Sequence, residues 1–278
     1  MSRLWPILLL CLAVYGLGHP PPDGWPLDPG LWVGLAGVSG LAGVFGLLHL
    51  SSHYLQARVV ALAWLVTRDP SRANLWYFRL MRPGVLVHEL AHAMAAAVVG
   101  GRVLAFNALE TSVVPGARGG QVRLGHVAYT IPGRPGAWTA RLRDAFVGLA
   151  PLPFGLLLIG GALALSGVDW GGDLAQTVPA ALPTWQFWLA LVAIIQVADN
   201  MTPSAPDRKN WPAALLTFGV LGGLVWTVLH LLAISLPAGW VTAAAQAAAV
   251  LAAVLVAPIA LNLLFGVLLW LLTRLFHR

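Results

Sequence analysis

The chain of 278 residues carries a His-Glu-x-x-His sequence, formed by His88, Glu89 and His92. Residues four apart share one face of a helix, so both imidazoles can bind a single metal ion. The glutamate beside them has the place of the general base in zinc hydrolases. The alternative is a pair of buried helix histidines that bond to backbone or water. We interpret the motif as a catalytic zinc centre with His88 and His92 as ligands and Glu89 as the base.

The composition is that of a membrane protein rather than of a soluble domain. Hydrophobic residues make up 59% of the chain and charged residues 9%, too few to cover an ordinary globular surface. We therefore expect a multi-pass protein of the cell membrane that contacts the lipid bilayer. The net charge of +6 comes almost entirely from arginine and forms no basic stripe, which argues against a nucleic-acid partner. The single cysteine, Cys11, excludes an internal disulfide and a thiolate zinc cage, so a metal must take nitrogen and oxygen ligands.

The apolar stretches predict an all-α polytopic membrane protein with six to seven transmembrane helices. A helix needs about 20 apolar residues to cross the bilayer, and we place such spans near 3–18, 30–50, 83–100, 144–166, 184–201, 211–236 and 240–272. The first is interpreted as a retained anchor, because Gly18-His19-Pro20 lacks a signal-peptide cleavage pattern. The last is either one tilted helix or two helices broken near Pro258. The stretch 54–67 is short and carries Arg58, which predicts an interfacial helix or a distorted partial span.

The charges of the loops indicate an orientation in the membrane. The loop 167–183 carries aspartates without a basic residue, whereas 201–210 and the C-terminus carry basic residues. By the positive-inside rule the first loop faces out and the other two face the cytoplasm, together with 101–143. Four arginines between residues 68 and 82 conflict with this scheme, unless 44–67 forms a distorted crossing or 68–83 dips into the membrane.

One part of the chain has the pattern of strands. Residues 102–109 and 120–131 alternate or are rich in β-branched and aromatic residues, and Pro115-Gly116 and Gly119-Gly120 lie between them as turn signals. We expect a small β-hairpin or two short strands at about 102–131. An exposed strand edge there could bind an extended peptide, although an ordinary connecting hairpin fits the sequence equally well. The whole chain, 1–278, is expected to form a single membrane domain without internal repeats.

A catalytic zinc with two histidine ligands needs a third protein ligand. The segment 198–210 is the best supplier, because it ends a predicted inward-running helix and its two prolines break the backbone and turn polar groups into a cavity. We choose Asp207 as this ligand and keep Asp199 in reserve. Alternatively, Asp207 is a solvated acid that pairs with Arg208 or Lys209.

These features together resemble the site-2 proteases, zinc metalloproteases that cut substrates within or near the membrane. The resemblance covers residues 83–210, where the histidine motif, a β-rich insert and a later Asn200-x-x-Pro203 followed by Asp207 occur in order. It implies that Asp207 completes the zinc coordination and that Asn200 helps to hold a substrate strand. The family pattern is Asn-x-x-Pro-x-Pro-x-Leu-Asp-Gly. Here the spacing is one residue shorter, and Pro206 and Arg208 flank the aspartate, as in a divergent member.

A second match to the family is Gly148-Leu149-Ala150-Pro151, which is similar to its small-residue and proline element. The whole pattern predicts an intramembrane zinc metalloendopeptidase that hydrolyses peptide bonds of membrane-embedded substrates. Its partners would be a membrane protein or peptide substrate and, because the loops are short, a membrane protein that delivers it. The alternative is a noncatalytic metal-binding membrane subunit or scaffold of a larger complex, against which the intact Glu89 argues. A transporter is disfavoured, because the acidic residues do not line up along several helices.

Overall fold

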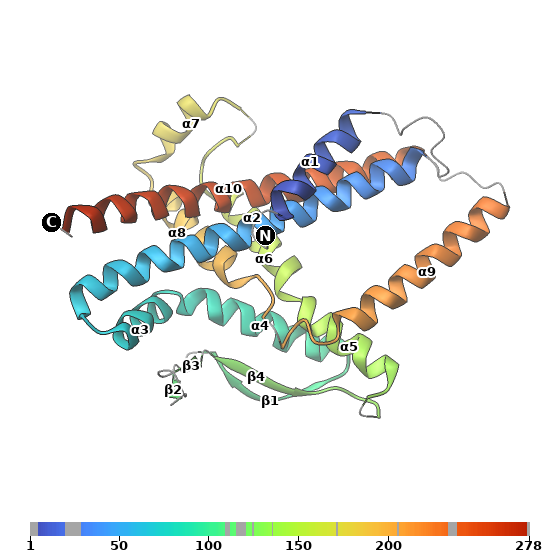
Figure 1. Cartoon of the computed structure of the whole chain (residues 1–278), viewed down its shortest axis with the longest axis horizontal. Coiled ribbons are helices and arrows are strands. Elements are labelled where there is room, and N and C mark those ends of the chain that lie inside the picture. The colour runs from blue at the N-terminus through green and yellow to red at the C-terminus, as the bar shows by residue number, and fades with distance from the viewer. Residues whose placement is uncertain are drawn as a thin grey trace.

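The computed structural model describes residues 5–19, 29–108, 112–114, 121–123, 125–134, 136–170, 172–204, 206–232 and 238–276. Within them the chain is mainly helical (Figure 1). The helices are α1 (Trp5–Gly18), α2 (Pro29–Thr67), α3 (Pro70–Leu80), α4 (Arg82–Val98), α5 (Trp138–Leu149), α6 (Pro151–Leu165), α7 (Leu174–Ala181), α8 (Trp185–Asn200), α9 (Trp211–Leu231) and α10 (Ala238–Phe276). The strands are β1 (Arg102–Asn107), β2 (Ser112–Val114), β3 (Gln121–Arg123) and β4 (His126–Thr130).

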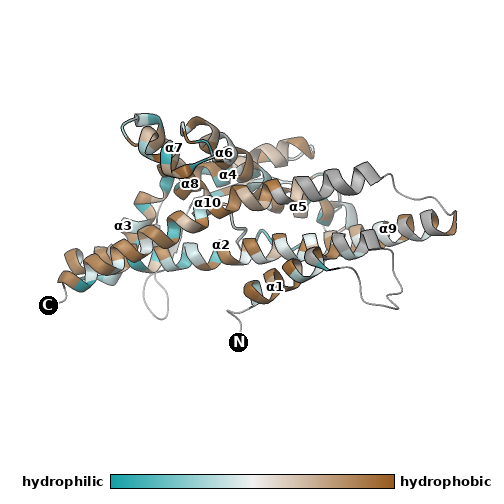
Figure 2. Cartoon of the chain, turned by 90° about the horizontal axis from the view of Figure 1, so that it is seen from above, coloured by the Kyte–Doolittle hydropathy of each residue, from teal (hydrophilic) through white to brown (hydrophobic). Residues whose placement is uncertain are grey.

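Two helices of 39 residues each, α2 and α10, lie side by side along the molecule, and α1 packs against α2 (Figure 1). In Figure 2 the described part of α10 is mainly hydrophobic, whereas α2 carries hydrophilic residues among its hydrophobic ones. The main hydrophobic core lies where α2, α6, α8 and α10 converge, and its buried residues are Val44, Leu48, Ile159, Leu163, Ile194, Val197, Ala198, Met201 and Leu255. On the other side of α8 lies α4, which also packs against α5, α6, β1 and β4. The helix that carries the histidine motif is therefore held from several sides.

The number of helices able to cross a membrane is smaller than the six to seven expected. In the described part of the chain, three segments are long and apolar enough, at 34–67, 138–165 and 250–276. A fourth results if α7 and α8 are counted as one span, although they meet at 105°. The apolar helices at 5–17 and 211–225 are shorter, and α4 has 17 residues. Helices α1 and α4 fall short of the about 20 residues that a hydrocarbon crossing requires, and of α9 only the part 211–225 was counted among the described residues.

The fold corrects one further expectation and decides between the alternatives of another. Residues 54–67 are neither a separate interfacial helix nor a partial span, because α2 continues through them to Thr67. Its Arg58 is accommodated against the ring of Tyr54, with the guanidinium carbon 4.9 Å from the ring centroid. Of the two alternatives for the C-terminal stretch, the structure has the single helix, with Pro258 inside it.

The insert after α4 is a β-structure, as expected. Strand β1 pairs antiparallel with β4, from Arg102 opposite Thr130 to Asn107 opposite His126, and β2 pairs antiparallel with β3. A glycine is required at 101, because a Cβ there would lie 2.5 Å from the Thr130 carbonyl oxygen. This close approach brings β4 back beside the end of α4.

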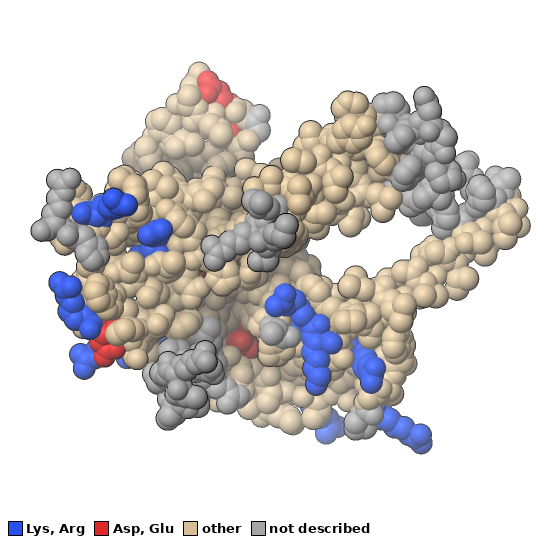
Figure 3. All heavy atoms as spheres, viewed as in Figure 1, with Lys and Arg blue, Asp and Glu red and all other residues tan. Residues whose placement is uncertain are grey.

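The charged residues are distributed unevenly over the surface. On the face shown in Figure 3, Lys and Arg gather towards α3 and towards α5, while most of the surface is uncharged. No charged residue occurs in α9, which packs against α5. The two acidic residues of the 167–183 loop, Asp169 and Asp173, lie at the end of the molecule formed by α7.

Candidate metal centre

The first part of the candidate site is the histidine-bearing helix α4, which lies against α8. Gly84 allows the close approach, since a Cβ at this position would collide with the backbone of Gln196 and the side chain of Asn200. The side-chain amide of Gln196 spans the junction. Its Nε2 donates to the Leu80 carbonyl at 2.8 Å, and its Oε1 accepts from the Gly84 N–H at 3.4 Å. These contacts fix the start of α4 one turn before His88.

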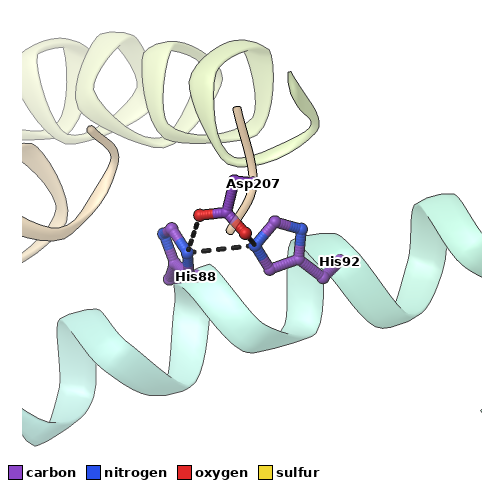
Figure 4. Close-up of side chains that lie close together, drawn as sticks. All are labelled: His88, His92 and Asp207. Atoms are coloured by element: carbon purple, nitrogen blue, oxygen red, sulfur yellow. Dashed lines mark hydrogen bonds and ion pairs between the residues drawn. The ribbon is translucent and has the colours of Figure 1, made fainter. Parts of the chain in front are cut away.

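The two histidines and Asp207 converge on one point (Figure 4). The Nε2 atoms of His88 and His92 are 3.0 Å apart. The Asp207 carboxylate faces them, with Oδ2 3.5 Å from His88 Nε2 and Oδ1 3.2 Å from His92 Nε2. The three side chains are largely buried, with 13%, 7% and 15% of their surface exposed. Among the described residues, this is the one group of three metal-ligating side chains whose ligand atoms all lie within 4.8 Å of one another.

The second nitrogen of each histidine is engaged by a backbone carbonyl. His88 Nδ1 lies 2.5 Å from the carbonyl oxygen of Asn200, and His92 Nδ1 lies 2.8 Å from that of Val147. A carbonyl oxygen can only accept, so each Nδ1 carries the proton and donates it. In the neutral imidazoles both Nε2 lone pairs then face each other and the carboxylate. Such an arrangement needs a positive charge at its centre, either protons or a metal ion.

The loop that follows α8 supplies Asp207. Its Oδ2 accepts hydrogen bonds from the backbone N–H of Ser204 at 2.7 Å and from the Ser204 hydroxyl at 2.6 Å. Burial alone would raise the pKa of Asp207, but the imidazoles of His88 and His92, when Nε2 is also protonated, and the groups of Ser204 donate to the carboxylate and hold that pKa well below its usual range. The carboxylate is therefore ionised and available as an anionic ligand.

The donor set fits a zinc ion in both chemistry and spacing. Two imidazole nitrogens and one carboxylate oxygen are a common ligand set of catalytic zinc, which keeps its fourth position for water or substrate. Ligand atoms at zinc distances in a tetrahedron lie roughly 3.3 Å apart. The two Nε2 atoms lie 3.0 Å apart, and each has a carboxylate oxygen of Asp207 near that distance, Oδ1 at 3.2 Å from His92 and Oδ2 at 3.5 Å from His88.

Glu89, the expected base, lies beside this group. It is buried, with 9% of its surface exposed, and the backbone of Val127 in β4 lies close enough to act on its carboxylate. In the described part of the insert, the second edge of β4 has no strand partner.

The other acidic candidate for third ligand lies elsewhere. Asp199 Oδ1 accepts from Asn262 Nδ2 at 3.0 Å, and the same nitrogen donates to the Ser52 hydroxyl at 3.0 Å. Asp199 thus belongs to a buried polar cluster between α2, α8 and α10, whereas Asp207 lies at the histidines. Asp207 faces them rather than Arg208 or Lys209 in the ion pairs of the described residues.

Asn200, expected to hold a substrate strand, contributes its backbone to the centre. Its carbonyl receives the His88 Nδ1 contact, and its side-chain Nδ2 donates to the Gln196 carbonyl at 2.8 Å. A role of the Asn200 side chain towards substrate stays a prediction.

Sequence reasoning did not find the groups of α5 that surround the centre. They are the Val147 carbonyl, Gly148 and Asp144, and a backbone carbonyl leaves no signal in the sequence. Gly148 was noticed only as part of a family-like element. Its place is now explained, because a Cβ at 148 would collide with the backbone carbonyl of Asp207.

Comparisons with known proteins give no relative from which a role could be transferred. No protein-family model, no curated protein and no solved structure matches this chain.

Proposed function

We propose that the chain is a zinc-dependent metalloendopeptidase of the cell membrane, with several membrane-spanning helices, that hydrolyses peptide bonds of membrane-embedded substrates. The observation that carries the proposal is the convergence of two imidazole lone pairs and the Asp207 carboxylate beside the buried Glu89. The sequence resemblance to site-2 proteases over residues 83–210 supports the same conclusion.

His88, His92 and Asp207 would hold the zinc ion, which would supply an electrophile for the peptide carbonyl and lower the pKa of water. The backbone carbonyls of Asn200 and Val147 keep the two imidazoles in the tautomer that presents Nε2. Glu89 accepts a proton from the attacking water and passes it to the amine as the carbon–nitrogen bond breaks.

A membrane helix must unwind before such a site can cut it, because its carbonyls are bonded internally. In the described part of the insert β4 pairs with β1 alone, and backbone groups on its other edge could replace the helical bonds of an extended substrate segment. This edge is the part of the insert that we assign to substrate binding.

Comparative proteomics of membrane fractions tests the proposal. Cells that carry the natural chain should contain a cleaved membrane-protein fragment that is absent with Glu89→Gln, because the glutamine keeps the shape of the side chain but not its basicity. Zinc content is the control, since Glu89→Gln should retain the metal. If both proteins hold zinc and co-purify with the same partner, yet no fragment differs, the chain is a metal-binding scaffold and not a protease.

A further inference from the structure

The carboxylate of Asp144 in α5 joins two separate parts of the site. Its Oδ1 accepts a hydrogen bond from the Tyr129 hydroxyl of β4 at 2.8 Å, and its Oδ2 accepts one from Asn210 Nδ2 at 2.5 Å. Asp144 is half-buried, and no ion pair in the described residues involves it. Both of its oxygens are therefore used to connect the strand with the loop that follows α8.

The loop end of this connection lies next to the third ligand. Asn210 follows Asp207 by three residues, and Gly148, one helical turn after Asp144, lies against the Asp207 backbone. Helix α5 thus contacts both ends of the segment 207–210. The same helix offers the Val147 carbonyl to His92. Through these contacts α5 holds the Asp207 carboxylate opposite the two histidine side chains.

The strand end of the connection lies next to the base. Tyr129 is two residues from Val127, whose backbone lies near the Glu89 carboxylate, so the strand that Asp144 holds through Tyr129 runs beside the base. Burial and the bond to Asp144 raise the pKa of Tyr129, which keeps the phenol protonated as a donor. A displacement of β4 would therefore be transmitted through Tyr129 and Asp144 to the ligand loop.

We propose that Asp144 is a positioning residue that holds Asp207 against the histidines and links the metal-ligand loop to strand β4. This inference rests on the proposed function, because it takes the three converging side chains as a zinc site. It predicts that the hydrogen bonds of Asp144 set the zinc affinity, although Asp144 does not touch the ion. Partners of metal ligands typically change the affinity by about 10-fold to 100-fold when they are altered.

The experiment measures zinc affinity of the purified full-length protein in detergent, by competition with a chromophoric chelator. Asn210→Asp places two carboxylates against each other, and Asp144→Leu removes both acceptors, so each should weaken zinc binding about 10-fold to 100-fold. Tyr129→Phe deletes one hydroxyl only and should cost about fivefold.

The double variant Asp144→Asn, Asn210→Asp is the decisive one. Its new Asn amide can donate to the new carboxylate and accept from the Tyr129 hydroxyl, so both hydrogen bonds are rebuilt with exchanged polarity. Zinc affinity should return to within about threefold of the original. Recovery by exchange is not expected from a residue that only fills space.

Thr217→Val serves as the matched control. It removes the 2.9 Å bond from Trp138 Nε1 to Thr217 Oγ1, which ties α5 to α9 away from the site, and should leave zinc affinity unchanged. Thermal unfolding of the metal-free proteins identifies variants that lose their fold. Unchanged zinc affinity in Asn210→Asp and Asp144→Leu would overturn the role of Asp144, as would a folded double variant without recovery. If the natural protein itself binds no zinc, the proposed function fails as well, and the two failures are thereby distinguished.

Discussion

His92 and Val147 are joined by a contact of 2.8 Å between the imidazole Nδ1 and the carbonyl oxygen, which ties α4 to α5 at the candidate metal centre. The contact fixes the tautomer of His92, and the corresponding contact of His88 with the Asn200 carbonyl fixes the other imidazole. Each histidine thus depends on a helix other than its own. The site is an assembly of α4, α5 and the loop after α8, and its metal affinity should respond to changes in all three.

The packing of α5 against the ligand loop can be tested at Gly148. In Gly148→Ala the added methyl group meets the Asp207 carbonyl, so the loop must move away from the histidines. We expect zinc affinity to fall about tenfold or more, measured by chelator competition. Gly160→Ala in α6 is the control, because nothing lies within 4 Å of its Cβ. Equal affinities in the two variants would show that the loop adapts without disturbing the site.

The junction of α3, α4 and α8 depends on Gln196. Replacing it by leucine leaves the Leu80 carbonyl and the Gly84 N–H without their side-chain partner. The free energy of unfolding in detergent should fall by about 1–3 kcal/mol, the typical cost of unsatisfied buried polar groups. Gln186→Leu, at an exposed position of the same helix, should change it by less than about 0.5 kcal/mol. A junction held by packing alone would make the two variants equally stable.

Two variants test which of the two aspartates near the end of α8, Asp207 or Asp199, is the third metal ligand. Asp207→Asn removes the anionic charge at the histidines and should weaken zinc binding about 100-fold or more. Asp199→Asn alters the cluster with Asn262 and Ser52 and should leave zinc affinity within about twofold. Isothermal titration of both proteins decides between them. The opposite order of affinities would move the third ligand to Asp199.

The parts of the site that could be predicted from the sequence are the local ones. The spacing of His88 and His92 specifies one helical face regardless of the rest of the fold. The position of Asp207 followed from a proline-broken segment after a helix, together with a family resemblance. The groups of α5 could not be predicted, because the carbonyl of Val147 acts through the backbone and Asp144 meets Asn210 only through the tertiary fold.

The interpretation of residues 54–67 was wrong for a related reason. Hydropathy shows which stretches are apolar, but not where one helix continues into the next. Residues 54–67 follow a polar stretch that includes Ser51 and Ser52, which looked like the end of a span. In the fold, Asn262 of α10 donates to the Ser52 hydroxyl at 3.0 Å, so α2 continues through this stretch without a break. A partner 210 residues away cannot be identified from a local pattern.

The zinc content of the purified protein tests the central claim most directly. Metal analysis should find about one zinc per chain in the natural protein and in Glu89→Gln, and little or none in His88→Ala and His92→Ala. The reason is that the two histidines present their Nε2 atoms to the shared ion, whereas Glu89 lies beside it as the base. Zinc that remains at the same level in both histidine variants would contradict the account, because the ion would then be bound elsewhere.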